Sequence, residues 1–414
     1  MGLNILTNVL VVRITRHVTR ERGRLMVKRE PIRGEYSKYI NETRRAVPTP
    51  KSMVRPDGSC EFGTFDKEFE EMELLKLNGP TALPNAFNRL KLTLWEATEV
   101  HFDNGILLAV VCDMGIFGKT LNVFYDKRTK TTYCWDTDLK SKDTQIAPNL
   151  IKGSVAFAKT DVSFVKYVNT FDEGKAHLSG SHKGKCLITV PRKDKTAVAA
   201  MKENVGEATI DYDVELTRIS DPCVASIPFD KKRPRPLYSQ KDFFKAEGEL
   251  TFNGEKMVSN ENTVAIIDDH RGYYPRRAHY DWVTTLGRYN IDGEDMYLAF
   301  NLTRNQSIDQ ARYNENILWL EGTSSILPPV KFSRNPETKD FKDYQEVYIK
   351  DQYDMVNLTQ KVYSINPMIT HAGVVNIDYY ITFGELEGYI RDETGKKYDL
   401  TGCVGMGEDK TLLL

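Results

Sequence analysis

One stretch of the chain gathers most of the side-chain types that acid–base chemistry uses. The run DDHRGYYPRRAHYDWVTTLG, residues 268–287, brings aspartate, histidine, arginine, tyrosine and tryptophan together directly after the apolar run TVAII. Such a concentration of ionisable and aromatic groups beside an apolar segment is typical of a ligand pocket. We therefore expect residues of this stretch to line a pocket.

The second half of this stretch predicts a strand with two chemically different faces. If the chain is extended from Arg277, then Arg277, His279 and Asp281 share one face. Tyr280 and Trp282 lie on the opposite face. An imidazole next to a carboxylate can move a proton near neutral pH. The competing interpretation is an ion-pair network that only stabilises a barrel rim.

The residues before that strand allow two interpretations. Asp269 could supply an acid to the pocket. Alternatively, Asp268, Asp269 and His270 form a tight turn, because Asp and the following Gly272 favour bends and Pro275 stops a strand from continuing.

A second polar cluster lies within AFNLTRNQSIDQARYNENILWLEG, residues 299–322. Asn301 ends an apolar strand, and Glu315 stands between Asn314 and Asn316 just before the next strand. A carboxylate flanked by two amides can orient a polar ligand or act as an acid. It can equally cap backbone amides at a turn.

The common cofactor and metal motifs are missing. The sequence has no GxGxxG or Walker loop, no HExxH, no GxSxG and no cysteine with a catalytic signature. Most histidines are scattered, which argues against a metal site. We therefore expect no cofactor and no metal.

Composition limits the partners. The 57 basic and 58 acidic residues leave a net charge of -1, so we expect no nucleic-acid partner. The six cysteines form no CxxC pair, which indicates reduced thiols and a cytoplasmic protein. No apolar run reaches membrane-spanning length, and membrane association is not expected. The expected partner is a small, lipophilic or partly polar molecule; the sequence predicts no oligomeric state.

The N-terminus, MGLNILTNVLVVRITRHVTRERGR, is apolar and then basic, the reverse of the order in a signal peptide. It predicts a short helix or strand with a charged tail, with a membrane-surface anchor as the alternative.

The elements that must position these residues are predicted to be strands. Alternation of apolar and polar residues with period two recurs along the chain, bounded by turn-forming residues. It is found at 105–113, 121–136, 162–171, 208–219, 296–303 and 374–390. The best helix candidate is 66–77, and 195–205 is a weaker one. Many short strands joined by turns predict an all-β fold of antiparallel sandwiches or barrels.

A proline-rich basic segment, PFDKKRPRPLYSQ at 228–240, is the expected domain boundary. It divides the chain into an N-terminal extension (1–45), an N-terminal β domain (46–235) and a C-terminal β domain (236–414) that carries the polar pocket.

The two polar clusters also resemble a known family. DDHRGYYPRRAHYDWVTTLGRYNIDGEDMYLAFNLT, followed by NENILWLEGTSSILPPVKF, is similar to the bacterial and fungal family called domain of unknown function 2804 (DUF2804). The resemblance covers about residues 80–410, and the chain's tail keeps Glu408 but lacks the tryptophan that usually closes such sequences. The family pattern falls on Asp269, Gly272, Tyr273, Tyr274, Pro275, Arg277, Tyr280, Trp282, Asn301, Glu315, Asn316, Trp319 and Gly322.

This family resembles, through a double lipocalin-like (calycin) architecture, the carotenoid 1,2-hydratases. The resemblance implies two tandem antiparallel barrels with a few short helices, and a ligand cavity inside or between them. It implies no particular reaction.

The leading hypothesis is a cofactor-independent acid–base enzyme, a lyase or isomerase of hydratase, isomerase or cyclase type. Its expected catalytic residues are Asp269, Glu315 and His279. The expected ligand-binding residues are Tyr273, Tyr274, Arg277, Tyr280, Asp281, Trp282, Asn301, Asn316 and Trp319. Two alternatives stay open: a non-catalytic small-molecule or lipid binding protein, and a carbohydrate-active enzyme. The latter requires Asp269 and Glu315 to face each other across one cavity.

Overall fold

The computed structural model describes residues 20–21, 24–25, 34–147, 154–191, 205–335, 345–372 and 375–413. The chain divides into two compact units, residues 1–31 and 32–414. In the first unit, β1 (Arg20–Glu21) and β2 (Arg24–Leu25) form a two-stranded antiparallel sheet. Most of the predicted N-terminal extension, and the predicted helix at 195–205 except for its last residue, lie outside the described residues.

In the second unit, the larger of two sheets closes on itself. Its path runs β15-β17-β5-β6-β7-β8-β12, and β13 pairs with both β12 and β15, which completes a ring. The ring strands are β5 (Thr93–His101), β6 (Gly105–Asp113), β7 (Phe117–Asp126), β8 (Thr131–Lys140), β12 (Lys175–Thr189), β13 (Val205–Arg218), β15 (Pro236–Phe252) and β17 (Val264–Gly272). Every neighbouring pair in the ring is antiparallel, and closure removes exposed strand edges. We call this ring the first barrel.

Shorter strands extend the first sheet outside the ring. They are β3 (Ala46–Val47), β4 (Gly63–Phe65), β9 (Thr144–Ile146), β10 (Ser154–Lys159), β11 (Ser163–Thr170), β14 (Cys223–Pro228) and β16 (Glu255–Val258). β3 and β4 form a parallel pair of two residues each, and the other pairs are antiparallel.

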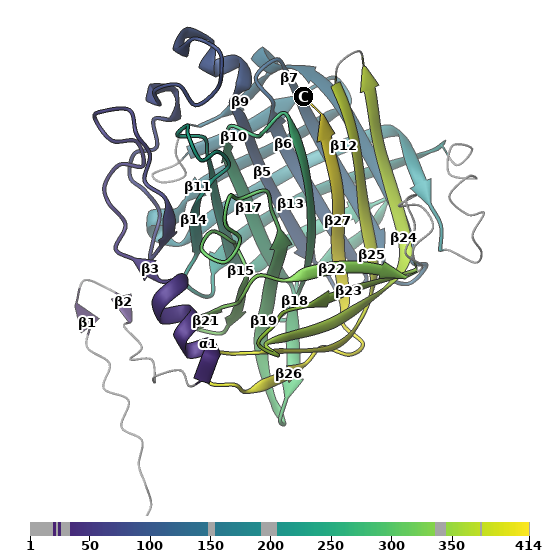
Figure 1. The fold of residues 1–414 in the computed structure, drawn as a ribbon. Helices are drawn as coiled ribbons and strands as arrows, with labels where there is room; N and C mark the ends of the chain where they lie inside the picture. Colours follow the sequence, from purple (N-terminus) through teal and green to yellow (C-terminus); the bar gives the residue numbers. More distant parts are fainter. Residues whose placement is uncertain are drawn as a thin grey trace, which may run out of the picture. The chain divides into compact units, whose positions relative to one another are not determined.

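The second sheet is an antiparallel half-barrel. Its order is β21 (Thr323–Ile326), β20 (Ile317–Leu320), β19 (Glu294–Arg304), β18 (Arg277–Ile291), β27 (Val404–Leu413), β25 (Val375–Arg391), β24 (Val356–Ala372), β23 (Glu346–Lys350) and β22 (Lys331–Asn335), with β26 (Lys397–Asp399) beside β25. The long strands β24, β25 and β27 run side by side (Figure 1). The predicted all-β fold with two tandem antiparallel units is therefore confirmed, although the second unit, predicted to be a barrel, closes only halfway.

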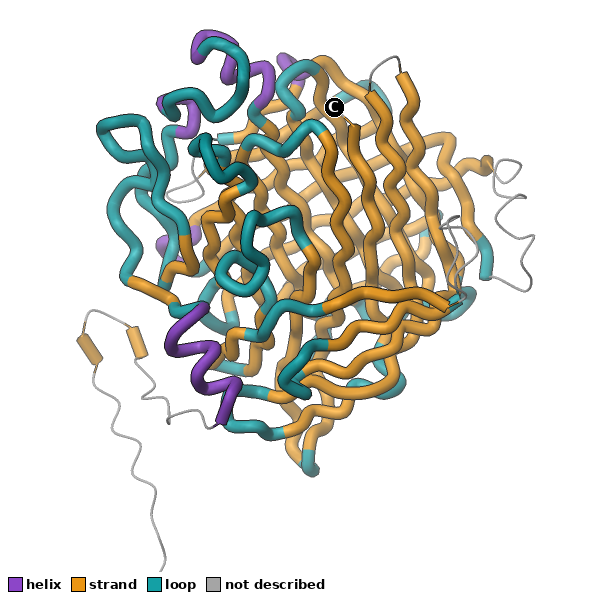
Figure 2. The backbone as a smooth tube through the Cα atoms, in the orientation of Figure 1, coloured by secondary structure: helices purple, strands orange, loops and turns teal. Residues whose placement is uncertain are grey.

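Helical structure is confined to short pieces (Figure 2). They are α1 (Gly34–Lys38), the π-helical turn η1 (Tyr39–Thr43) and the 3-10 turns η2 (Leu74–Lys76), η3 (Asn85–Lys91), η4 (Ser141–Asp143) and η5 (Phe171–Glu173). Among the described residues, none of these helices has the length and apolar character needed to cross a membrane.

The helix predicted over 66–77 is wrong. Only its last turn, η2, is helical, and Glu73 adopts a left-handed backbone conformation with φ 45°. Phe69, Met72 and Leu77 are buried in the core of the first barrel. They reach the core from an irregular segment, so their spacing does not reflect one helical face.

Strand β6 shows how the two sheets share the interior. Every residue of β6 is buried. Leu107 and Val111 point into the core of the first barrel, whereas Leu108 and Val110 join the apolar cluster between the sheets. An apolar residue is needed on both faces, which explains the continuous run GILLAVVCD. In the same intersheet layer, the rings of Tyr125 (β7) and Phe383 (β25) stack at 4.5 Å and 4°.

The chain passes from the first sheet to the second between β17 and β18, after Gly272. The segment 228–240 connects β14 to β15 within the first sheet. The division into domains at 45/46 and 235/236 stays a prediction. The turn expected at Asp268–His270 is wrong, since these residues belong to β17 and pair with both β15 and β5.

Candidate functional site

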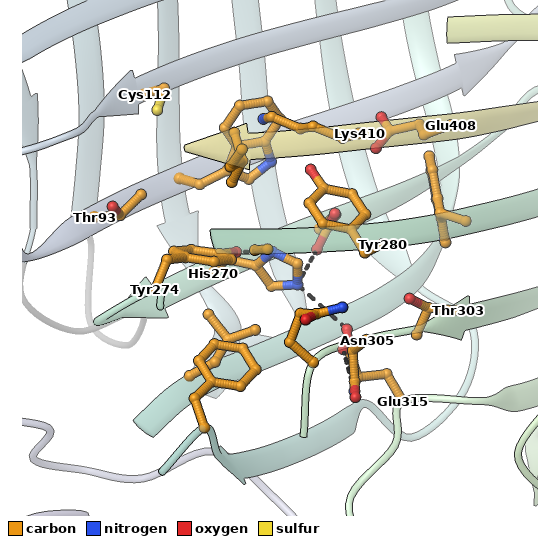
Figure 3. Close-up of a pocket in the computed structure, with 18 of the residues that line it drawn as sticks. Thr93, Cys112, His270, Tyr274, Tyr280, Thr303, Asn305, Glu315, Glu408 and Lys410 are labelled. Atoms are coloured by element: carbon orange, nitrogen blue, oxygen red, sulfur yellow. Dashed lines mark hydrogen bonds and ion pairs between the residues drawn. The ribbon is translucent and has the colours of Figure 1, made fainter. Parts of the chain in front are cut away.

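A cavity lies between the two sheets, where β5, β15 and β17 face β18 and β27 (Figure 3). Its volume is about 50 Å³. That is room for a few water molecules, so a larger ligand must displace side chains when it binds. The lining residues are Thr93, Trp95, Cys112, Met114, Phe229, Leu237, Lys241, Asp268, His270, Tyr274, Ala278, Tyr280, Trp282, Thr303, Asn305, Gln306, Glu315, Glu408, Lys410 and Leu412.

Strand alternation decides which side chains reach this cavity. On β17, Asp268 and His270 face the cavity. On β18, Tyr280 and Trp282 do so, and on the adjacent β27 their pairing partners Lys410 and Glu408 do too. Residues between them in sequence point the other way, because successive side chains of a strand alternate.

A buried ion network forms one wall. Lys241 on β15 is 1% exposed, and its Nζ lies 2.5 Å from Asp268 and 3.1 Å from Glu315. Ser239 donates a hydrogen bond of 2.7 Å to Glu315. Burial acts to raise the pKa of Glu315, but Lys241 and His270 outweigh it and hold that pKa below its ordinary value. Glu315 is therefore ionised at neutral pH.

His270 connects this network to a tyrosine. Its Nε2 lies 3.2 Å from Asp268 and 3.3 Å from Glu315, and its Nδ1 lies 3.1 Å from the Tyr274 hydroxyl. If Nε2 carries the proton and donates to a carboxylate, Nδ1 accepts a hydrogen bond from the Tyr274 hydroxyl. If Nε2 instead accepts from Lys241 at 3.1 Å, Nδ1 donates to Tyr274, whose own proton then faces the cavity. The imidazole tautomer thus sets whether the Tyr274 hydroxyl donates or accepts the hydrogen bond to His270.

Glu408 lies on the second sheet (Figure 3). Burial raises its pKa to about 7, even though Tyr379 donates a hydrogen bond to it and Lys410 lies nearby. Lys410 stands 4.4 Å from the ring centre of Tyr379 and 4.9 Å from that of Trp95. Burial lowers the pKa of Lys410. One cavity therefore holds two carboxylates, Glu315 and Glu408, whose pKa values are moved in opposite directions.

Four of the residues expected at the site line this cavity: Tyr274, Tyr280, Trp282 and Glu315. Three others are buried but do not line it. Asn301 accepts a hydrogen bond of 2.5 Å from Trp282 Nε1 and donates one of 2.8 Å to the backbone oxygen of Glu315. Asn316 bonds to the backbone of Thr303 and Pro328, and the buried Trp319 donates to the backbone oxygen of Asp221.

The remaining expected residues lie elsewhere. Asp269 and Tyr273 are fully buried in the first barrel, on the opposite side of β17 and its continuation, and Arg277 is exposed. His279 and Asp281 share a face of β18, as expected, but that face points away from the cavity. The structure therefore does not bring Asp269 or His279 to Glu315. The carboxylate pair that the carbohydrate hypothesis requires does not face one cavity.

His279, Asp281 and Asp409 form the one group among the described residues with metal-ligand geometry. Arg334 lies within ion-pair distance of both aspartates, and Arg304 also pairs with Asp281. The guanidinium groups supply the positive charge that a metal would bring, so this group fits an ion-pair network.

Sequence reasoning missed Lys241, Asp268, His270, Glu408 and Lys410 as site residues. Alternation in VAIIDDHRG separates Asp268 and His270 from Asp269 and Arg271, but it does not show which pair faces the ligand. Lys410 belongs to the last strand, whose register with β18 comes only from the fold.

The chain belongs to the family described as Domain of unknown function (DUF2804), whose family model matches residues 44–412. The resemblance seen in the sequence is thus confirmed. A search of curated proteins gave no match.

Among solved structures, the chain is similar to CghA with Sch210972, with a TM-score of 0.44, 9% identity and coverage of 79% of this chain and 89% of that chain. It is also similar to kievitone hydratase from Nectria haematococca, with a TM-score of 0.41, 10% identity and coverage of 78% and 88%. Similarity at this level is too remote to transfer a ligand or a reaction.

Proposed function

We propose that this protein is a cofactor-independent acid–base enzyme of hydratase, isomerase or cyclase type, acting on a small lipophilic or partly polar molecule in the intersheet cavity. The observation that supports this proposal is that Glu408, from the second sheet, and the bonded pair of His270, from β17, and Tyr274, from the link after β17, line one largely apolar cavity. Two proton-transfer groups on different walls can act on different atoms of one substrate.

In this proposal Glu408 is the general acid. Its pKa of about 7 keeps a substantial fraction protonated near neutral pH while still allowing proton release. His270, through Tyr274, is the general base. The carboxyl groups of Glu315 and Asp268 orient the imidazole, and the ionised Glu315 stabilises the cation that forms when it takes a proton.

The aromatic walls have a second role. Tyr280 and Trp282 line the cavity from β18, and Trp95 lines it from β5. Their ring faces pack on an apolar substrate and stabilise positive charge that develops on carbon when a double bond is protonated.

The protons balance for a hydration. Glu408 gives a proton to one carbon of a double bond. The base takes a proton from water while the water oxygen bonds to the other carbon. For an isomerisation the base removes a proton from one carbon and the acid delivers one to another. No oxidant or cofactor is required in either case.

The alternative is a binding protein without catalysis. A carrier of an apolar ligand gains nothing from buried charges, each of which costs free energy to desolvate. The cavity nevertheless carries Lys241, Asp268, His270, Glu315, Glu408 and Lys410. This surplus favours the enzyme.

We also propose a reducing compartment such as the cytoplasm. All six cysteines are free thiols, and five of them are buried. Such thiols persist where disulfides do not form.

The test is incubation of the protein with a small-molecule extract of its own host, prepared in D2O and followed by mass spectrometry. Proton transfer to carbon leaves deuterium in the product, so a compound that gains one heavy water, or exchanges one hydrogen for deuterium without other change, reveals the reaction. Glu408→Gln is the matched control and is expected to leave the extract unchanged. If wild-type protein retains a compound through native mass spectrometry but converts none, the binding alternative holds.

A further inference from the structure

A second, larger cavity lies at one end of the first barrel. Its volume is about 730 Å³, within the range of small-molecule sites. Leu94 on β5 pairs with Asp113 on β6 and with Arg271 on β17, and all three line this cavity. The register therefore sets three inward-facing side chains at the same level of the barrel. This cavity and the intersheet cavity share no lining residue.

The walls of the second cavity are mainly apolar. Leu74 and Leu92 are each 5% exposed, and Leu94 and Ile146 are partly buried beside them. Such walls accept an aliphatic chain, because burial of apolar surface is favourable.

The guanidinium group of Arg271, a buried residue of this cavity, has hydrogen-bond donors without partners. Arg271 is 1% exposed. Its Nη2 donates to Asp269 at 2.9 Å and lies 3.6 Å from Glu96, but Nε and Nη1 have no hydrogen-bond partner. Buried donors are rarely left unsatisfied, because the loss of hydration costs free energy. An oxygen acceptor from a ligand would satisfy them.

Arg89, a second arginine of the cavity, also has a buried hydrogen-bond donor without a partner. Arg89 bonds to Asp113 through Nη2, while its buried Nη1 has no partner. Among the lining residues, three are basic (Lys76, Arg89 and Arg271) and two are acidic (Glu73 and Asp113).

Two carboxyl groups, those of Asp269 and Glu96, lie beside the Arg271 guanidinium. Burial raises the pKa of Asp269 well above its ordinary value and also raises that of Glu96, although Arg271 opposes the shift in both cases. Both shifts disfavour the ionised form of the carboxyl group and so weaken the neutralisation of the Arg271 charge.

We infer that the first barrel contains a separate binding site for an amphipathic carboxylate, of the saturated fatty-acid type. The aliphatic chain lies against Leu74, Leu92, Leu94 and Ile146. The carboxylate oxygens accept hydrogen bonds from the unpartnered nitrogens of Arg271 and Arg89, which suit the planar acceptor geometry of a carboxylate.

The test is calorimetric titration of the full-length protein with decanoate, with decanol as the uncharged comparison. Decanoate is expected to bind one site, more tightly than decanol. Ile146→Trp fills the cavity from a half-buried position and is expected to abolish binding. Arg89→Gln removes a charge-assisted donor and is expected to weaken binding roughly tenfold or more.

A control variant distinguishes decanoate binding in the barrel cavity from binding in the intersheet cavity. Gln306→Trp obstructs the intersheet cavity from a half-buried position and is expected to leave decanoate affinity unchanged. Circular dichroism verifies that each variant is folded. The inference is overturned if decanoate does not bind, if decanol binds as tightly as decanoate, or if Gln306→Trp abolishes binding while Ile146→Trp does not.

Discussion

The hydroxyl oxygen of Tyr274 lies 3.1 Å from Nδ1 of His270, and both side chains line the cavity between the sheets. His270 in turn contacts the carboxyl groups of Asp268 and Glu315, which line the same cavity. A proton taken up at Tyr274 can therefore be shared with the imidazole, and its charge is balanced by Asp268 and Glu315.

Tyr274→Phe is expected to lower turnover by roughly 10²- to 10⁴-fold, the usual contribution of a positioned acid–base group. The free energy of unfolding should fall by only about 1 kcal/mol, the net value of one hydrogen bond. Turnover and urea unfolding are measured on the same preparation. Tyr363→Phe is the control, since it removes a hydroxyl that bonds to Glu385 outside the cavity. Wild-type turnover by Tyr274→Phe would exclude its hydroxyl from the proton path.

Glu408 predicts a pH dependence of turnover. A general acid must be protonated, and the pKa of Glu408 is about 7 because of burial. We expect kcat/KM to decline as the pH rises through about 7. Glu408→Gln should lose most of the activity, and its residual kcat/KM should not decline through pH 7. A decline that is centred instead near the ordinary carboxyl pKa would show that Glu408 is not the acid.

Glu408 also makes the free energy of unfolding depend on pH. Its pKa rises from 4.5 to about 7 on folding, so the folded state binds the extra proton between these values. The stabilising contribution is complete below pH 4.5 and is lost as the pH rises through 7, a difference of about 3 kcal/mol. In urea unfolding at pH 8, Glu408→Gln should therefore be more stable than wild type. An equal or lower stability would contradict the burial of an ionised Glu408.

Lys241→Met is expected to destabilise the protein by about 3–5 kcal/mol, because it leaves the buried charge of Glu315 without its cation. Lys241 lowers the pKa of Glu315 and so stabilises the fold above the ordinary carboxyl range; this contribution is lost as the pH falls through the lowered pKa. Adding Glu315→Gln to Lys241→Met should restore part of the stability in urea unfolding. If the two effects simply add, the residues are not coupled.

Phe383→Ala tests whether the two sheets fold together. Phe383 is fully buried and stacks on Tyr125 of the first barrel, so its truncation should cost about 3–5 kcal/mol. Thermal unfolding is expected to shift to lower temperature as a single transition. Phe87→Ala, at a residue that is 48% exposed, should shift it little. A second transition in Phe383→Ala would show that the sheets unfold separately.

The sequence by itself determined the class of fold and the nature of the strand faces. Residues 105–113 and 374–390 show the apolar and β-branched patterns of strands, and β6 and β25 lie there. The split of β18 into an aromatic face and a face with His279 and Asp281 also follows from residue order, because strand side chains alternate.

Only the tertiary structure decided which face meets the ligand. Strand alternation predicts that Asp268 and Asp269 point in opposite directions. It does not show which of them faces the second sheet. That sheet packs on one side of β17, so Asp268 lies at the intersheet cavity and Asp269 lies inside the first barrel. Glu408 reaches the intersheet cavity because β27 pairs with β18, although more than a hundred residues separate the two strands. Local sequence fixes backbone geometry, whereas contacts between distant strands depend on the packing of whole sheets.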